Sequence, residues 1–299
     1  MSMSKQKAIA VVGPTASGKS ALAITLAKEI HGEVISADSR QVYEGFDTTT
    51  AKVTPEEMLG IPHHLLDIAP IEREYTVADF VHDGKAAITS IAAKGAIPII
   101  AGGTGFYIDA LLFGQSLPQV PPNQVLRASL TTMTTDTLFA MLQAKDPHRA
   151  ATIEQQNKQR LIRALEIVDT LGVVPPQATM SDAPYDTLWI GILWQRDELI
   201  QRIHERVLHR VDNMITEISN ERNRLTPQIA SRLGFDFTLT LSYVEGAMTK
   251  DALIDALTQK DAAYARRQMT WFKRNKQITW LSPETLPSSA IDLARRFLA

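Results

Sequence analysis

The chain has 299 residues, enough for one large domain or two of ordinary size. Its hydrophobic share of 44% predicts a substantial core and excludes global disorder, and the absence of cysteine excludes disulfides, thiolate metal sites and cysteine nucleophiles. A net charge of −2 gives no general support for a nucleic-acid or membrane partner, so any such partner must be argued from local patches.

The N-terminal residues are polar and lead directly into an apolar segment, which predicts that no signal peptide is present. No apolar run approaches the ~20 residues that a membrane-spanning helix needs. A chain without cysteine also suits a reducing compartment. We therefore expect a soluble cytoplasmic protein that makes no membrane contact and acts as a monomer.

Short apolar runs alternate with helical patterns at both ends of the chain. In chain order, the patterns predict a strand at 8–12, a helix at 19–30, a strand at 33–38, a helix at 77–94 and a strand at 98–103. Further strands are predicted at 188–193 and 278–281, and helices at 197–214 and 260–276. Strands that alternate with helices indicate an α/β fold with a parallel sheet.

The middle of the chain has a different pattern. Residues 115–186 show no convincing strand, and proline-rich segments open and close this stretch. Helices are predicted between Thr135 and Leu171, with Asp146 as an N-cap and Pro147 as a first helical residue. We therefore predict a helical insertion domain at 115–186, within a core formed by 1–114 and 187–299.

The segment "GPTASGKS" matches the phosphate-loop pattern G-x-x-x-x-G-K-[ST] between a predicted strand and a predicted helix. Glycines let the backbone amides face an anion, and the following helix presents its positive end. Lys19 adds a charge, and the Ser20 hydroxyl is a candidate Mg²⁺ ligand. The expected diphosphate-binding residues are Gly13, Pro14, Thr15, Ala16, Ser17, Gly18, Lys19 and Ser20. The pattern does not distinguish ATP from another diphosphate.

Asp38 follows the second predicted strand. Because ligands bind at the carboxyl edge of such sheets, this carboxylate is a candidate Mg²⁺ ligand or general base, with a turn or capping role as the alternative. The polar residues Ser39, Arg40 and Gln41 come next and suit contacts with the edge of a base. Thr104 follows the third strand within "GGTG", where it can reach a phosphate or serve a tight turn.

Three other features have both a functional and a structural interpretation. Arg206 and Arg210 are four residues apart, so they share one face of a helix that binds phosphate or faces solvent. The segment "YARRQMTWFKRNK" combines basic and aromatic residues, which suits RNA or an amphipathic helix. The pair His63 and His64 is expected to be structural or to contact substrate, because neighbouring side chains point apart and no further metal ligands are visible.

Taken together, several motifs resemble those of the tRNA dimethylallyltransferases, also called tRNA isopentenyltransferases. They occur in the family's order between residues 8 and 275: "GPTASGKS", "ADSRQVY", "TAKVT", "PHHLLDI", "IIAGGTGFY", "NKQRLIRALEI", "RVLHRVDNM" and "YARRQMTWFKRN". The resemblance implies a P-loop, nucleotide-kinase-like core with an inserted, all-helical domain that grips tRNA. It also implies transfer of a dimethylallyl group from dimethylallyl diphosphate to N6 of the adenosine 3′ to the anticodon. The phosphate loop then holds the diphosphate and not ATP.

The resemblance also implies roles for individual residues. Lys19, Thr104, Arg210 and Ser20 with Mg²⁺ would neutralise the leaving diphosphate, and Asp38 would accept the N6 proton. The tRNA contacts it implies are Asp38, Ser39, Arg40, Gln41, Thr104, Arg127, Gln159, Arg160, Leu161, Ile162 and Arg163.

Some positions depart from the family pattern. Many relatives have Gly-Tyr-Lys-Glu where this chain has Gly234 to Phe237, and "TAKVT" lacks the usual proline. The arginine motif can also be aligned one turn earlier, which nominates Arg206 in place of Arg210. From the residues alone, an ATP-dependent small-molecule kinase and a nucleotide-sensing RNA-binding protein remain alternatives.

Overall fold

The computed structural model describes residues 5–114, 118, 120–175 and 183–299. The chain divides into two compact units, a core unit of 1–114 with 183–299 and a helical unit of 115–182. Among the described residues, none of the helices is both long enough and apolar enough to cross a membrane.

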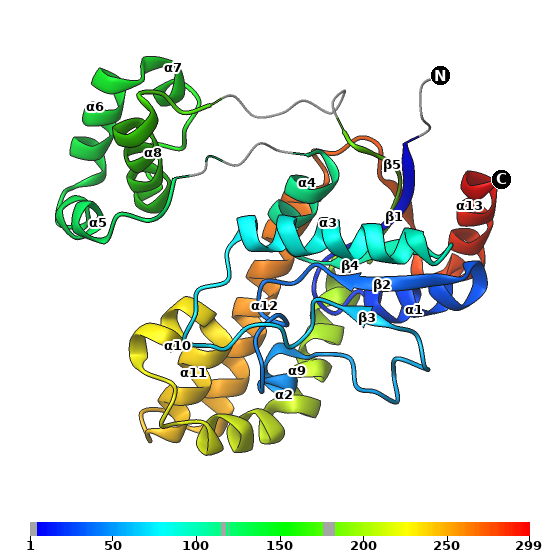
Figure 1. The fold of residues 1–299 in the computed structure, drawn as a ribbon. Coiled ribbons are helices and arrows are strands. Elements are labelled where there is room, and N and C mark those ends of the chain that lie inside the picture. The colour runs from blue at the N-terminus through cyan, green and yellow to red at the C-terminus, as the bar shows by residue number, and fades with distance from the viewer. Residues whose placement is uncertain (1–4, 115–117, 119, 176–182) are drawn as a thin grey trace. The chain divides into compact units, whose positions relative to one another are not determined.

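The core unit is built on a parallel sheet of six strands in the order β3-β2-β4-β1-β5-β6 (Figure 1). The strands are β1 (Gln6–Val12), β2 (Gly32–Ser36), β3 (His63–His64), β4 (Ile97–Gly102), β5 (Tyr185–Ile192) and β6 (Thr279–Leu281). Both faces of the sheet are covered, so strand β1 is buried from Ala8 to Val12 and its sequence is almost continuously apolar.

Helices pack on both faces of this sheet. Ile9 and Val11 of β1 face a core with α1 (Lys19–Ile30) and α13 (Ser288–Leu298), whereas Ala8, Ala10 and Val12 face α3 (Val77–Ala93) and α4 (Gly105–Leu112). Figure 1 shows α3 and α1 on opposite sides of the sheet. This alternation follows from the two-residue period of a strand, and it gives the core unit three layers.

A group of helices stands beside the carboxyl edge of the sheet. It contains α2 (Asp47–Thr50), α9 (Arg196–Asn220), α10 (Pro227–Leu233), α11 (Phe235–Val244) and α12 (Lys250–Phe272). The long helices α9 and α12 meet through an apolar cluster that includes Val207, Met214 and Leu257. This contact determines which faces of α9 and α12 are turned toward the ends of the strands.

Three strand ends converge next to these helices. Because β4 lies between β2 and β1, the segments that follow these strands are neighbours. They carry the phosphate loop after β1, Asp38 after β2 and Thr104 after β4. The site therefore forms at the edge where ligands bind in open parallel sheets.

The helical unit contains α5 (Gln124–Thr131), α6 (Thr135–Lys145), α7 (Pro147–Ala150) and α8 (Lys158–Leu171). The side chain of Asp146 accepts a hydrogen bond from the backbone N–H of Arg149, and Pro147 is the first residue of α7, as the sequence predicted. Leu138, Leu142, Leu161 and Leu165 lie in its separate core. The unit thus has its own apolar interior.

The α/β architecture and the parallel sheet predicted from the sequence are confirmed. Helix α1 spans the predicted 19–30, whereas β5 begins at Tyr185, inside the last residues of the predicted insertion. The sequence analysis did not predict β3, which has only two residues, too few for a recognisable alternation. Part of the proline-rich segment at 173–184 lies outside the described residues.

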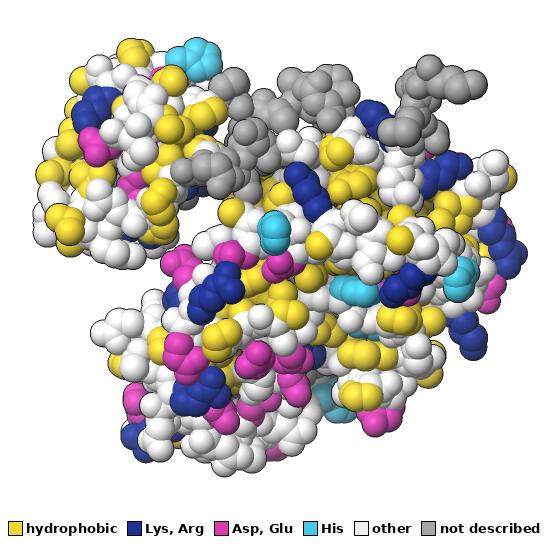
Figure 2. Space-filling model, in the orientation of Figure 1, with side chains coloured by type: hydrophobic (Ala, Val, Ile, Leu, Met, Phe, Trp, Pro, Cys, Tyr) yellow, Lys and Arg dark blue, Asp and Glu magenta, His cyan; other side chains and the backbone are white. Residues whose placement is uncertain are grey.

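Charged residues are mixed over the surface. Figure 2 shows Lys and Arg side chains scattered among Asp and Glu on the visible face, with acidic side chains gathered over the end of the core unit that carries α10 and α11. No single sign covers this face, which agrees with the near-neutral composition. The positive charge that matters for an anionic ligand lies inside the site.

Candidate active site

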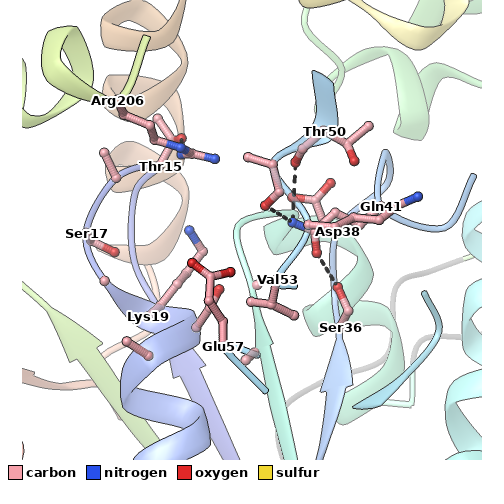
Figure 3. Close-up of a pocket in the computed structure, with 18 of the residues that line it drawn as sticks. Thr15, Ser17, Lys19, Ser36, Asp38, Gln41, Thr50, Val53, Glu57 and Arg206 are labelled. Carbon is pink, nitrogen blue, oxygen red and sulfur yellow. Dashed lines mark hydrogen bonds between the residues drawn. The ribbon is translucent and has the colours of Figure 1, made fainter. Parts of the chain in front are cut away.

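The phosphate loop wraps around a concavity at the start of α1 (Figure 3). Gly18, with φ of 89°, is the N-cap of α1 and offers no side chain to the first-turn amides. The buried hydroxyl of Ser17 also meets no partner among the described residues. Donors left unpaired at a helix N-terminus form a ready site for an anion.

Lys19 reaches back over this loop. Its Nζ donates to the carbonyl oxygen of Pro14 over 3.1 Å. Burial above all, together with the nearby Arg206 guanidinium, lowers the pKa of Lys19 to about 8, although Asp38 and Asp261 act in the opposite direction. The ammonium is therefore poorly solvated and crowded by a second cation, and an incoming anion would relieve both effects.

Helix α9 supplies two arginines to the outer side of the loop. Arg206 Nη1 donates to Oγ1 of Thr15 over 2.6 Å, and Arg202 Nε donates to the carbonyl oxygen of Ala16 over 3.0 Å. The Arg202 guanidinium also lies 4.3 Å from the ring centroid of Trp194, whose indole N–H donates to the Ser17 carbonyl oxygen. These contacts place two guanidinium groups at the mouth of the phosphate loop.

Gln268 of α12 joins the phosphate loop to the β4 end. Its Oε1 accepts from the backbone N–H of Thr15 over 2.8 Å, and its Nε2 donates to the carbonyl oxygen of Gly103 over 3.0 Å. A Cβ atom on Gly103 would lie 2.1 Å from Gln268 Nε2, so only glycine leaves room for this amide. The sequence analysis missed Gln268, although it lies within the basic and aromatic segment that attracted attention.

Asp38 is held at the end of β2 by a tight turn. Its Oδ1 accepts from the backbone N–H of Arg40 over 2.9 Å, while the backbone N–H of Ser39 donates to Oγ1 of Thr104 over 3.1 Å. Thr104 in turn donates its backbone N–H to the Ala37 carbonyl oxygen over 3.2 Å. The two polar residues expected to act together are thus linked, and Figure 3 shows Asp38 across the cavity from Lys19 and Arg206.

The turn and capping role weighed for Asp38 is therefore real, and one carboxylate serves both the turn and the cavity. Tyr264 of α12 lines the same cavity as Asp38. Burial above all, and the Asp38 charge, raise the pKa of its phenol to about 12. Tyr264 therefore stays protonated at neutral pH and can donate a hydrogen bond into the cavity.

Gln41 is engaged within the protein. Its Oε1 accepts from the Ser36 hydroxyl over 2.9 Å, and its Nε2 donates to the Ala51 carbonyl oxygen over 3.1 Å, with Thr50 nearby (Figure 3). These contacts fix the segment after α2 against the end of β2. Gln41 thus forms a wall of the site, and its amide is already paired where a contact with a base was expected.

Lys52 anchors the same wall. Its buried ammonium donates to the Tyr43 carbonyl oxygen and to the carboxylates of Asp47 and Asp67. All three N–H donors are used in this way, so Lys52 serves the fold and not a bound anion.

The histidine pair has contacts within the protein. His63 lines the cavity, and its Nδ1 lies 2.8 Å from the Ile61 carbonyl oxygen. Nε2 of His64 lies 2.7 Å from a carboxylate oxygen of Glu33.

Two cavities meet at this place. The larger, of about 720 Å³, contains the phosphate loop, and the smaller, of about 250 Å³, lies toward Arg40 and Phe235. Both are lined by Thr15, Asp38, Thr50, Arg206 and Tyr264. We call the larger the donor cavity and the smaller the acceptor cavity. Asp38 and Arg206 therefore line both cavities.

Arg210 is not part of the donor cavity. Its Nη2 lies 2.7 Å from Oδ1 of Asp236 and 3.2 Å from Oδ2 of Asp261, and its Nη1 donates to the Thr49 carbonyl oxygen. The assignment of Arg210 to the diphosphate therefore finds no support in these contacts, because two carboxylates hold the guanidinium in the acceptor cavity. The alternative alignment, which nominated Arg206, agrees with the geometry.

In the helical unit, the residues expected to contact tRNA divide into two groups. Leu161 and Ile162 are buried in the unit's core, so they support α8 and cannot present their side chains to a ligand. Gln159 and Arg160 are exposed on the first turn of α8. The signal that separates them is the 3.6-residue period of the helix.

Arg127 and Arg163 share the carboxylate of Glu166, whose side chain is fully buried. Arg127 Nε and Nη2 donate to the two oxygens over 2.8 and 2.9 Å, and Arg163 Nη2 donates to the Val120 carbonyl oxygen. These hydrogen bonds hold the pKa of Glu166 below its usual range despite its burial. The two guanidinium groups are therefore fixed in place and keep part of their surface exposed.

The chain is similar to known proteins along nearly its whole length. A family model described as IPP transferase matches residues 41–275. A tRNA dimethylallyltransferase of Oceanobacillus iheyensis is 37% identical over 94% of this chain and 92% of its own, and one of Thermomicrobium roseum is 40% identical over 93% and 87%.

Solved structures agree with these relatives. The full-length tRNA isopentenylpyrophosphate transferase of Bacillus halodurans is 35% identical, with a TM-score of 0.74 over 98% of this chain and 96% of its own. A eukaryotic dimethylallyltransferase acting on tRNA has a TM-score of 0.81 at 26% identity, over 98% of this chain and 79% of its own. The likeness thus includes both the core unit and the helical unit.

Proposed function

The chain belongs to the IPP transferase family, and on that premise we propose that it transfers a dimethylallyl group from dimethylallyl diphosphate to tRNA. The acceptor is N6 of the adenosine 3′ to the anticodon. The observation that carries this proposal is the meeting of two cavities at Asp38 and Arg206. Such a geometry admits a donor and an acceptor from different sides and joins them at one point.

The donor cavity suits a diphosphate. The amides of the phosphate loop, Lys19, Arg202 and Arg206 surround the place where its oxygens would lie. As the allylic C–O bond breaks, its electron pair stays with the diphosphate, and negative charge grows there. Donors fixed in advance stabilise this charge most strongly in the transition state, which accelerates the reaction.

The acceptor cavity suits the adenine, which must leave its stack to reach Asp38. The N6 lone pair forms the new C–N bond while the C–O bond breaks, and the nitrogen becomes cationic. Asp38 then accepts the N6 proton, and the Tyr264 phenol, which lines the same cavity, orients the amine. The Thr104 hydroxyl does not line this cavity and supports Asp38 through the Ser39 backbone N–H. Arg40 and Arg267 line the outer part of this cavity and suit the RNA backbone.

Mg²⁺ fits this site in one way. Ser20 lines the donor cavity, but among the described residues no cluster of three His, Asp or Glu side chains is arranged to hold a metal. Mg²⁺ often keeps several waters and binds mainly through substrate phosphates. We propose that the Ser20 hydroxyl would hold the ion together with phosphate oxygens and waters. Bound there, Mg²⁺ would neutralise part of the charge of the leaving group.

The helical unit would grip the tRNA through Arg127, Arg160, Arg163 and Gln159. Arg127 and Arg163 are preorganised by Glu166, which reduces the entropy that binding must overcome. We propose further that the protein acts in the cytoplasm as a monomer.

A direct assay tests this function. Isotope-labelled dimethylallyl diphosphate is incubated with bulk bacterial tRNA and Mg²⁺, and label in RNA is followed together with ATP consumption. We expect label at N6 of an adenosine, abolished in Lys19→Ala, and no ATP turnover. ATP consumption without label would instead support the small-molecule kinase, and tight ATP binding with slow hydrolysis would support the nucleotide sensor.

A further inference from the structure

Arg210 is a buried cation with two acidic partners. Its side chain is 10% exposed and lies against Asp236 of α11 and Asp261 of α12, whose side chains are 22% and 7% exposed. The three residues come from three different helices, so the contact forms only when α9, α11 and α12 are packed together. A buried charge is retained at such a place only if it is paired.

The pairing leaves one donor of Arg210 without a partner. Its Nη1 and Nη2 serve Thr49, Asp236 and Asp261, whereas its buried Nε meets no acceptor among the described residues. Arg210 lines the acceptor cavity, and so does Asp236. An unpaired buried N–H beside a cavity is expected to find its acceptor in a ligand.

The same two carboxylates determine which cavity the Arg210 guanidinium lines. Arg206, one turn earlier on α9, faces the phosphate loop through Thr15. Without acidic partners, Arg210 could extend in the same direction and add a further cation next to Lys19 and Arg206. With them, Arg210 lines the acceptor cavity and not the donor cavity, whereas Arg206 lines both.

We propose that Asp236 is a positioning residue that holds Arg210 in the acceptor cavity, where the arginine serves the RNA and not the diphosphate. The proposal rests on the proposed function, because it assigns the acceptor cavity to RNA. Asp261 is the second partner, but it also faces Arg206 and Lys19, so its removal would disturb both cavities. Asp236 pairs directly with Arg210 and acts on Arg206 only through its charge, so it is the cleaner residue to change.

The test compares donor and acceptor kinetics in Asp236→Asn, which keeps the shape of the side chain and removes its charge. The KM for dimethylallyl diphosphate and the KM for an anticodon stem-loop RNA are measured separately, together with RNA binding in the absence of donor. Arg210→Lys and Arg210→Met are measured in parallel. The matched control is Asp212→Asn. Asp212 lies on the same helix as Arg210 and pairs with Lys250 at the surface.

We expect Asp236→Asn and Arg210→Met to raise the KM for RNA about tenfold, since each disturbs a buried charge pair, and to leave the donor KM within about twofold. Arg210→Lys should recover part of the RNA affinity, because its charge can still pair with Asp236. A rise in the donor KM, an equal rise in both, or no change in either would overturn the proposal. If the wild-type protein labels no RNA, the proposed function fails. RNA binding then tests the role of Asp236 separately, because weaker binding in Asp236→Asn would still support it and unchanged binding would contradict it.

Discussion

Arg206 Nη1 lies 2.6 Å from Oγ1 of Thr15, although the two residues are 191 positions apart in the chain. This contact brings α9 over the phosphate loop and places a guanidinium where the donor and acceptor cavities meet. A phosphate loop alone supplies amides and one lysine. The arginine from α9 adds a second fixed charge to the same cavity.

Arg206 should therefore be essential for holding and activating the diphosphate. Arg206→Ala is expected to lower kcat/KM by about 10²–10³-fold, as for the loss of one preorganised donor to a developing anion. Steady-state kinetics with varied dimethylallyl diphosphate measures this effect. Arg222→Ala, an exposed arginine near the end of the same helix, serves as the control and should retain wild-type kinetics. Equal kinetics for both variants would remove Arg206 from the site.

Lys19 should make diphosphate binding depend on pH. Because burial lowers the pKa of Lys19 to about 8, the free protein carries the ammonium below pH 8 and loses it above. Affinity for inorganic diphosphate should fall between pH 7 and 9, by up to about tenfold per pH unit above the pKa. Isothermal titration calorimetry on wild type and Lys19→Arg separates this effect from the ionisation of the ligand, because arginine does not titrate in this range. Parallel profiles for the two proteins would contradict the assignment.

The same shift has a consequence for stability. The unfolded chain binds the Lys19 proton up to its ordinary pKa of 10.5, whereas the folded chain releases it near 8. The unfolded state therefore binds more protons between these values, so the destabilisation caused by the buried ammonium decreases as the pH rises across this window. A bound diphosphate should remove this pH dependence, because it holds the ammonium charged.

Asp38 should act in the chemical step and not in RNA binding. Asp38→Ala is expected to lower kcat by about 10²–10⁴-fold, the range for loss of a positioned base, while RNA affinity stays within a few-fold. Single-turnover transfer and filter binding measure the two quantities. Asp197→Asn, an exposed acid in the first turn of α9, provides the control. Near-normal turnover in Asp38→Ala would remove this residue from the mechanism.

Gly102 should be required by packing. A Cβ atom at this position would lie 2.1 Å from the carbonyl oxygen of Ala37, which belongs to the backbone and cannot turn aside. Gly102→Ala should destabilise the protein by about 1–3 kcal/mol, since overpacking forces the backbone to shift. Because the same segment positions Thr104, transfer activity should fall as well.

Gly84 of α3 gives the comparison for Gly102. Its added Cβ would meet the side chain of Leu111 at 2.9 Å, which can move, and alanine favours the helix. Urea denaturation of both variants should therefore show a much smaller loss for Gly84→Ala. An equal loss in the two variants would contradict the argument from backbone crowding.

The sequence by itself determined the parts of this protein that depend on local patterns. The spacing of Gly13, Gly18, Lys19 and Ser20 specifies an anion loop between a strand and a helix, because glycine conformations and helix amides act over a few residues. The alternation of apolar runs with helical patterns likewise predicted a parallel sheet, and so placed Asp38 and Thr104 at one edge.

Only the tertiary structure decided how distant side chains are paired. Arg206 and Arg210 share one helix face, so their pattern is the same in the sequence. Their difference arises from Thr15 on one side and from Asp236 and Asp261 on the other. Gln268 meets Thr15 across 253 positions for the same reason. Such pairs are set by the packing of α9, α11 and α12 beside the sheet edge, because burial forces each polar group to find the partner that packing brings within reach.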